Sequence, residues 1–197
     1  MSSVFACLRV SRDGFVAGHD RGPEHSPDHA SGGPWGDGEP RAGALGAAFA
    51  VEAGAAKPPR AGAHVVGRRM FEKGRAGRPS DPPPFRGPVF VLTSRAREPW
   101  VGEDGTTFTF VTDGIASALD QALTAAGGSD VQVSGGAQTV RQFLNAGLLD
   151  ELEIHFAPMV LGTGERLFEG VDRGLRLVPV RVTGSPEVTH VSYRVGR

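Results

Sequence analysis

Three short segments of the sequence carry residues suited to holding phosphate groups. In each, an apolar run ends and glycine or a small polar residue opens the next segment: Gly67-Arg68-Arg69, Thr93-Ser94-Arg95 and Ser134-Gly135-Gly136-Ala137. In open α/β sheets, ligands bind beyond the carboxyl ends of the strands. N–H groups at a helix start bind anions, and glycine lets the backbone approach closely. The three segments therefore indicate one site for an anionic ligand.

Arginine and serine in these segments add donors to that site. Guanidinium groups pair with phosphate through several hydrogen bonds at once. Taken together, the segments favour a dinucleotide with an additional phosphate, NADPH rather than NADH. Read singly, a Gly-Gly pair after a strand is also typical of a plain tight turn. The sequence has neither GxGxxG nor GxxxxGK[ST], so a standard Rossmann fingerprint and a P-loop are not supported.

The elements that must position these segments alternate between strand and helix. Apolar runs predict strands over 4–10, 63–67, 88–93, 106–111, 131–136 and 151–158. Helical spacing predicts helices from residue 68, from a cap at Thr112-Asp113 to Gly127-Gly128, and before a break at Gly147, with an Ala-rich helix over 42–56. Two closing runs, 175–183 and 188–195, predict an antiparallel hairpin. This order favours an α/β fold with a doubly wound, mostly parallel sheet and an antiparallel C-terminal edge.

Composition limits the class of protein. With 197 residues we expect a single domain over 1–197, and the formal net charge of −1 disfavours nucleic acid and anionic membranes as partners. No run of 18 apolar residues and no signal sequence is present, so we expect a cytoplasmic protein. The single cysteine excludes a disulfide framework. Cys7 is either a nucleophile or a small buried side chain, and we favour the second because its own segment contains no histidine.

Four stretches resemble one family in order and spacing. They are SRDGFVAG (11–18), GRRMFE (67–72), VLTSR (91–95) and the long stretch 133–170, which contains VSGGAQT and GLLDELEIHFAP. The chain resembles the dihydrofolate reductase-like family, which includes the reductase domain of bifunctional bacterial riboflavin biosynthesis enzymes. The resemblance covers nearly the whole chain, and 19–60 match least.

The resemblance implies a three-layer αβα dihydrofolate reductase-like fold and a homodimer, with NADPH across the strand ends. It implies hydride transfer by an oxidoreductase that is similar to 5-amino-6-(5-phosphoribosylamino)uracil reductase or to dihydrofolate reductase. In the implied site, Ala17 and Gly18 lie near the nicotinamide and Thr93, Ser94 and Arg95 near the 2′-phosphate. Gly67, Arg68, Arg69 and Met70 meet the phosphates, and Gly135, Gly136, Ala137, Gln138 and Thr139 hold the pyrophosphate. Met70 departs from the Thr usual in dihydrofolate reductases and removes one hydroxyl donor.

The proton that accompanies the hydride has no clear donor in the sequence. Dihydrofolate reductases carry a carboxylate on a helix soon after a Trp. Asp37 and Glu39 after Trp35, and Glu52 in the predicted helix, do not fit that pattern. This departure argues against folate as the substrate. In riboflavin-type reductases the Asp of the opening motif faces the substrate, which makes Asp13 a candidate catalytic residue; its alternative is a turn Asp before glycine.

Other polar clusters have simpler interpretations. His19, His25 and His29 share a Gly/Pro-rich loop over 19–41 with carboxylates, which is conceivable as a metal site. We expect instead a solvated loop and no metal, because nothing apolar anchors it. We also expect structural roles for His64 and His155 in strands, and for the pair Asp150-Glu151 between helix and strand.

Two functions from different classes remain open. The first is an NADPH-dependent reductase of a small heterocyclic or ribityl-type substrate with a C=N or C=O bond. The second is a non-catalytic protein of the same fold that binds a nucleotide or another small ligand. Retention of all three phosphate-binding segments favours the first, and the missing proton donor favours the second. No zinc deaminase motif accompanies the segments, which leaves riboflavin synthesis itself in doubt.

Overall fold

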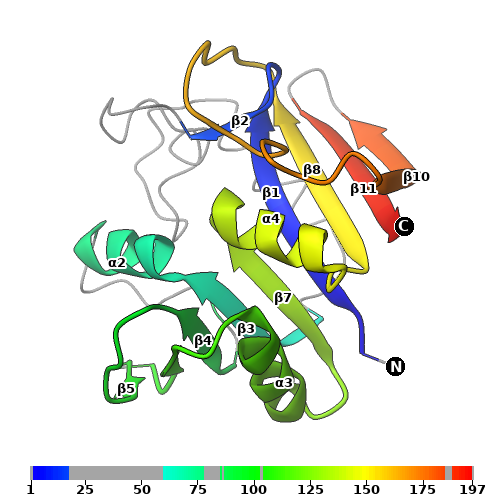
Figure 1. Ribbon diagram of the computed structural model, residues 1–197. Coiled ribbons are helices and arrows are strands. Elements are labelled where there is room, and N and C mark those ends of the chain that lie inside the picture. The colour runs from blue at the N-terminus through cyan, green and yellow to red at the C-terminus, as the bar shows by residue number, and fades with distance from the viewer. Residues whose placement is uncertain are drawn as a thin grey trace.

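The computed structural model describes residues 2–17, 60–77, 85, 87–102, 104–184 and 188–196, with the backbone alone for 17 and 73–77. A nine-stranded sheet dominates these residues, in the order β10-β11-β8-β1-β7-β3-β4-β6-β5 (Figure 1). Its members are β1 (Val4–Ser11), β3 (Ala61–Gly67), β4 (Val89–Leu92), β5 (Trp100–Val101), β6 (Thr107–Val111), β7 (Asp130–Gly135), β8 (Glu151–Ala157), β10 (Arg176–Gly184) and β11 (Thr189–Gly196).

The predicted sheet is confirmed. Strands β8, β1, β7, β3, β4 and β6 run parallel, and β10 and β11 form the expected antiparallel hairpin, which joins the sheet through β8. Prediction missed an antiparallel strand at the other edge, β5 against β6. It also missed a separate two-stranded sheet of β2 (Phe15–Ala17) and β9 (Glu165–Arg166). These three strands have two or three residues each, too few for a periodic apolar pattern.

Helices cover both faces of the sheet. Among the described residues these helices are α2 (Arg68–Gly77), α3 (Ile115–Ala126) and α4 (Ala137–Ala146). Buried residues of α3 and α4 share one core with Val65 of β3, whereas Phe71 of α2 packs with Val66, the next residue of that strand, in a second core. Successive side chains of a strand point to opposite faces, so α2 lies on the face opposite α3 and α4. Figure 1 shows α3 and α4 together in front of the sheet.

Glycine ends two helices where the sequence predicts it. Gly127 after α3 and Gly147 after α4 have φ of 58° and 64°, and each donates its N–H to a carbonyl of the last turn. A side chain is unfavourable at such positive φ. The predicted start of α3 is wrong by one or two residues: Gly114 is the N-cap, no described side chain caps the helix, and Thr112 bonds instead to Asp113.

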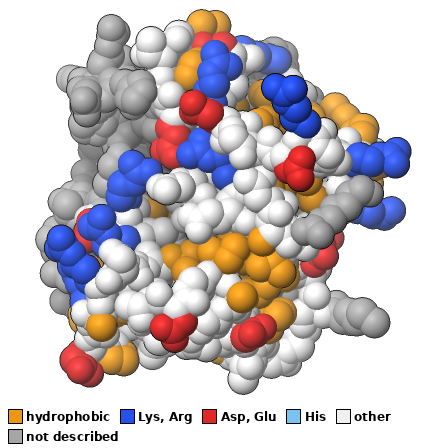
Figure 2. Space-filling view, viewed as in Figure 1, with side chains coloured by type: hydrophobic (Ala, Val, Ile, Leu, Met, Phe, Trp, Pro, Cys, Tyr) orange, Lys and Arg blue, Asp and Glu red, His pale blue; other side chains and the backbone are white. Residues whose placement is uncertain are grey.

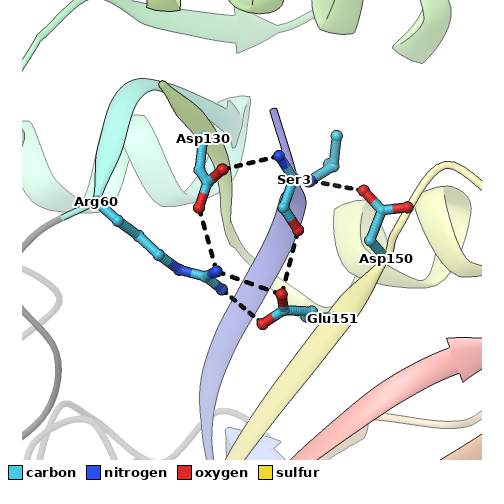
Figure 3. Close-up of polar contacts among 6 residues, drawn as sticks. Ser3, Arg60, Asp130, Asp150 and Glu151 are labelled. Carbon is cyan, nitrogen blue, oxygen red and sulfur yellow. Dashed lines mark hydrogen bonds and ion pairs between the residues drawn. The ribbon is translucent and has the colours of Figure 1, made fainter. Parts of the chain in front are cut away.

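A polar cluster ties the amino ends of the central strands together (Figure 3). Arg60, just before β3, contacts Asp130 of β7 at 3.1 Å and Glu151 of β8 at 2.8 Å. Asp150 accepts a hydrogen bond from the backbone N–H of Val4 at 2.8 Å. The structural interpretation of Asp150 and Glu151 therefore accounts for both side chains, and they lie at the edge of the sheet opposite the glycine segments.

No helix in the described part of the chain is long and apolar enough to cross a membrane. The Ala-rich helix expected over 42–56 lies outside the described residues. The single domain stays a prediction.

Candidate functional site

The three segments that the sequence predicts to hold phosphate groups lie in a row at one edge of the sheet. Strands β7, β3 and β4 are consecutive neighbours and run parallel. Their carboxyl ends lead directly into Gly136, Arg68 and Thr93. In sequence, the segment at Thr93 follows the one at Gly67 by 26 residues, and the segment at Ser134 follows about 40 residues later. In the sheet, the strands that lead into neighbouring segments are about 4.8 Å apart.

Gly67 marks the closest approach between two of these segments. A Cβ atom at this position would lie 2.5 Å from the Thr139 Oγ1 and 3.6 Å from the Gly135 carbonyl oxygen. The first distance is far below a van der Waals contact. Glycine at position 67 is what allows the start of α2 to lie against the start of α4.

The Gly135-Gly136 turn places open backbone at the start of α4. Gly135 has φ of 113°, and its peptide bond to Gly136 is cis. Met70 packs against this turn, with its Sδ 3.4 Å from the position of a Cβ on Gly135. Gly136 is the N-cap of α4 with φ of −66°, and no described heavy atom lies within 4 Å of the place where its Cβ would be. No described side chain caps this helix start. Thr139 donates its backbone N–H to the Gly136 carbonyl at 3.0 Å, so the N–H groups of Ala137 and Gln138 before it are the ones positioned for a ligand.

Side chains connect the starts of α2 and α4. Arg69 donates a hydrogen bond from Nη2 to the Gln138 Oε1 at 3.0 Å, and its Nη2 lies 3.7 Å from Glu165 Oε1. Arg141 of α4 contacts the same Glu165 oxygen at 3.3 Å. Glu165 belongs to β9, where it pairs with Ala17 of β2. The strand that contains Ala17 therefore lies next to the row of the three candidate segments.

Positive charge gathers at this edge (Figure 2). Arg68 forms an ion pair with Glu72 at 2.9 Å, and Arg97, from the segment after β4, lies 3.6 Å from the same carboxylate. Two arginines open α2, and its first turn has no acidic residue. Cations are unfavourable at a helix N-terminus, where the helix dipole is positive. An anionic ligand would remove this repulsion.

Thr93-Ser94-Arg95 forms an exposed turn after β4. Oγ1 of Thr93 accepts the Arg95 backbone N–H at 3.1 Å, so the threonine hydroxyl is already used to shape the turn. Ser94 and Arg95 are exposed, and their side chains are the groups of this segment that can reach a ligand.

Asp13 is held as an acceptor by the surrounding chain. Its carboxylate accepts hydrogen bonds from the Ser11 hydroxyl at 2.6 Å and from the backbone N–H groups of Leu161 and Gly162 at 3.1 and 2.7 Å. The Ser11 bond first, and the two backbone bonds after it, lower the pKa of Asp13 from 3.8 to about 2. An aspartate that is ionised throughout the neutral range does not donate a proton. This geometry favours the turn role of Asp13 over the catalytic one.

Several residues of this region could not have been found from local sequence. Glu165 and Arg141 act through contacts across 24 to 96 residues of chain. Glu72 had a signal, since it stands four residues after Arg68 on the helix. Gly18 and the loop with His19, His25 and His29 lie outside the described residues. Among the described residues, no three His, Cys, Asp or Glu side chains are placed to hold a metal ion.

Comparison with known proteins identifies the family. Residues 3–191 match the family described as the RibD C-terminal domain. The chain belongs to this family.

One curated relative matches in sequence, and solved structures match in fold. YyaP, an uncharacterized protein of Bacillus subtilis, is 34% identical over 85 residues, which span 43% of this chain and less than half, 45%, of that relative. A Shewanella sp. PV-4 protein described as a riboflavin biosynthesis protein matches with a TM-score of 0.69 at 22% identity, over 100% of both chains. Dihydrofolate reductase from Enterococcus faecalis, solved with NADP(H), matches with a TM-score of 0.58 at 14% identity, over 99% of this chain and 97% of its own. The RibD C-terminal domain and dihydrofolate reductase therefore share the α/β fold described above, and the predicted family and fold are confirmed.

Proposed function

We propose that this RibD C-terminal domain protein is an NADPH-dependent reductase, which transfers hydride to a C=N or C=O carbon of a small heterocyclic or ribityl-type substrate. The observation that carries the proposal is the row of Gly136, Gly67 to Arg69 and Ser94-Arg95 along three neighbouring strand ends. Family membership and the fold shared with dihydrofolate reductase support an oxidoreductase in general.

The residues of the row fit the phosphates of NADPH. The open backbone at Gly136 and the uncapped start of α4 suit a pyrophosphate. Arg68 and Arg69 at the start of α2 suit the same charge from the adjacent strand end. Ser94 and Arg95 are exposed beyond β4, further along the row, and they suit a 2′-phosphate. Bound there, NADPH would supply the hydride.

The protein's own contribution is then orientation. Fixed donors on three strand ends hold one end of an extended ligand, and this leaves the β1 side of the sheet for the other end and for the substrate. We infer a cytoplasmic, homodimeric protein, in keeping with the sequence-based expectation, with no nucleic acid or membrane partner.

The alternative is a protein that binds a nucleotide without turning it over. The turn role of Asp13 favours this alternative, because it takes away the proton donor that the sequence offered. A different donor is needed for the reductase.

Titration of the purified protein with NADPH and NADH, followed by nicotinamide fluorescence, tests the proposal. We expect NADPH to bind at least tenfold more tightly than NADH. The double variant Ser94→Ala/Arg95→Ala should lose most of that preference, because a charge-assisted hydrogen bond contributes about 1.5–3 kcal/mol, and should leave NADH affinity unchanged. Arg173→Ala, at an exposed turn before β10, is the matched control. Equal weakening of both cofactors would remove Ser94 and Arg95 from the 2′-phosphate, and failure of the wild type to bind either cofactor would refute the proposed function.

A further inference from the structure

A hydrogen-bonded array of one thiol and two imidazoles crosses three strands of the sheet. Cys7 Sγ of β1 lies 2.9 Å from Nε2 of His155 in β8. The Nδ1 atom of His155 contacts Nδ1 of His190 in β11, and the two rings are nearly perpendicular, at 76°. Cys7 and His155 are 148 residues apart in sequence, so the absence of a histidine from the segment of Cys7 does not exclude one as its neighbour in the sheet. All three side chains are half-buried.

Each hydrogen bond in this array requires one atom that carries a proton and one that offers a lone pair. A ring nitrogen carries either a proton or a lone pair, so only one of the two Nδ1 atoms can be protonated if they form a hydrogen bond. When His155 is protonated at Nδ1, its Nε2 accepts from the thiol of Cys7. Moving both protons one step leaves a thiolate on Cys7 and an imidazolium on His190. The chain of contacts can therefore carry a proton from one end to the other.

The array lies one strand away from the Gly135-Gly136 turn. Val133 of β7 is opposite Ala6 of β1, and His155 is opposite Arg9 of the same strand. The turn begins two residues after Val133, at the level of Leu8 and Arg9. Only β1 separates it from His155, which corresponds to about 10 Å across two strand spacings.

We propose that Cys7, His155 and His190 form a proton relay, which supplies the proton consumed when the substrate is reduced. This inference rests on the proposed reductase function. Reduction of a C=N or C=O bond adds a hydride to carbon and a proton to nitrogen or oxygen. The relay gives up that proton and regains one from solvent, so the protein returns to its starting state. Asp13, with its acceptor role, is not required for this step.

Charged groups of the neighbouring strands determine where the relay titrates. Those on the same face are Arg9 of β1, Glu151 and Glu153 of β8, Arg194 of β11, and Arg176 and Arg181 of β10. The test therefore compares variants within the array and does not rely on an absolute value.

Nuclear magnetic resonance of protein labelled with ¹³C at Cys Cβ and His Cε1 tests the relay directly. The chain has a single cysteine, so the Cys7 signal needs no assignment, and His190→Gln identifies the His190 signal. We expect the Cys7 and His190 signals to change together as the pH is varied, because proton exchange couples the two groups. His155→Gln keeps a polar side chain but cannot pass a proton, and the two midpoints should then separate by about one pH unit or more.

His64→Gln is the control, because His64 lies in β3 and bonds to Ser134 outside the array. The thermal unfolding midpoints of His64→Gln and His155→Gln are compared with that of the wild type, to check that both variants are folded. Unchanged Cys7 titration in His155→Gln would overturn the relay.

Addition of NADP⁺ separates the relay from the function on which it rests. We expect NADP⁺ to shift the Cys7 signal, since the cofactor site adjoins β1. A coupled titration with no response to NADP⁺, and no NADP⁺ binding, would leave the array acid–base active but overturn its part in a reduction. NADP⁺ binding without coupling would overturn the relay and leave the cofactor site intact.

Discussion

Gly136 is a position where the local backbone accepts a side chain but the proposed ligand does not. Its φ of −66° is ordinary for any residue, and the space around its missing Cβ is free of described atoms. Gly67 differs, because a side chain there would collide with Thr139 whether or not a ligand is bound. Of the glycines at the row, Gly136 is therefore the one at which loss of binding can be separated from loss of folding.

Gly136→Val should abolish NADPH binding and leave the unfolding temperature nearly unchanged. The valine side chain would occupy the space assigned to the pyrophosphate. Gly174→Val is a matched control, because a Cβ there would make only an ordinary 3.6 Å contact with Asp172, away from the row. Affinity from fluorescence titration and thermal unfolding followed by circular dichroism give the two readouts. NADPH affinity that survives in Gly136→Val would show that the pyrophosphate lies elsewhere.

Residue types in the row were readable from sequence, but their partners were not. Gly67, Arg68 and the Gly135-Gly136 pair could be identified from the sequence because they stand at the ends of apolar runs that predict buried strands. The contacts of Arg69 with Gln138 and Glu165, and of Cys7 with His155, depend on which strands become neighbours. That order is a property of the sheet, and no local pattern encodes it.

At the scale of elements, the long strands and the helices were predictable and the short connections were not. The strands β1, β7 and β8 have enough apolar residues to set a pattern, and Gly127 and Gly147 end their helices by a known backbone preference. The pairing of β2 with β9 has no such pattern. It is supported by Asp13, which joins the loop between β1 and β2 to the loop between β8 and β9.

Asp13→Asn should destabilise the protein at neutral pH by an amount that disappears in acid. The pKa of Asp13 is lowered from 3.8 to about 2, so its ionised form stabilises the folded state above pH 3.8. That contribution is lost as the pH falls from 3.8 towards 2. Thermal unfolding of the wild type and the variant between pH 7 and pH 2 measures the difference. Asp120→Asn, which makes the same change at an exposed position on α3, is the matched control. A constant difference between wild type and Asp13→Asn down to pH 2 would contradict the prediction.

Over the whole molecule, the cluster around Arg60 fixes the order of the central strands. Its guanidinium contacts the first residue of β7 and the first residue of β8 (Figure 3). It also lies 4.0 Å from the ring centre of Phe5 in β1. Four parallel strands are thus joined at their amino ends by one side chain, while the candidate site occupies their other ends.

Arg60→Met should lower global stability without affecting ligand affinity. Loss of a partly buried ion pair that leaves two carboxylates behind costs about 1–3 kcal/mol, and at this size each kcal/mol lowers the unfolding temperature by about 2–4 °C. Arg173→Met is a matched exposed control and should change stability by less than about 0.5 kcal/mol. Chemical denaturation and NADPH titration measure the two properties. A loss of NADPH affinity as large as that of Gly136→Val would contradict the separation of the two edges.

The position of β7 between β1 and β3 has a consequence for how the chain folds while the ribosome is making it. The strand at the amino end of the chain has β7 and β8 as its lateral neighbours, and both are made more than 115 residues later. Until the ribosome has delivered them, both edges of β1 lack their native partners, and the glycine turn after β7, one of the three segments of the candidate site, has not been made. Such distant pairings slow folding and leave strand edges available for wrong association. The position of β7 between β1 and β3 brings the glycine turn next to the start of α2. The same position means that an incomplete chain must either be finished quickly or be kept from associating with other incomplete chains.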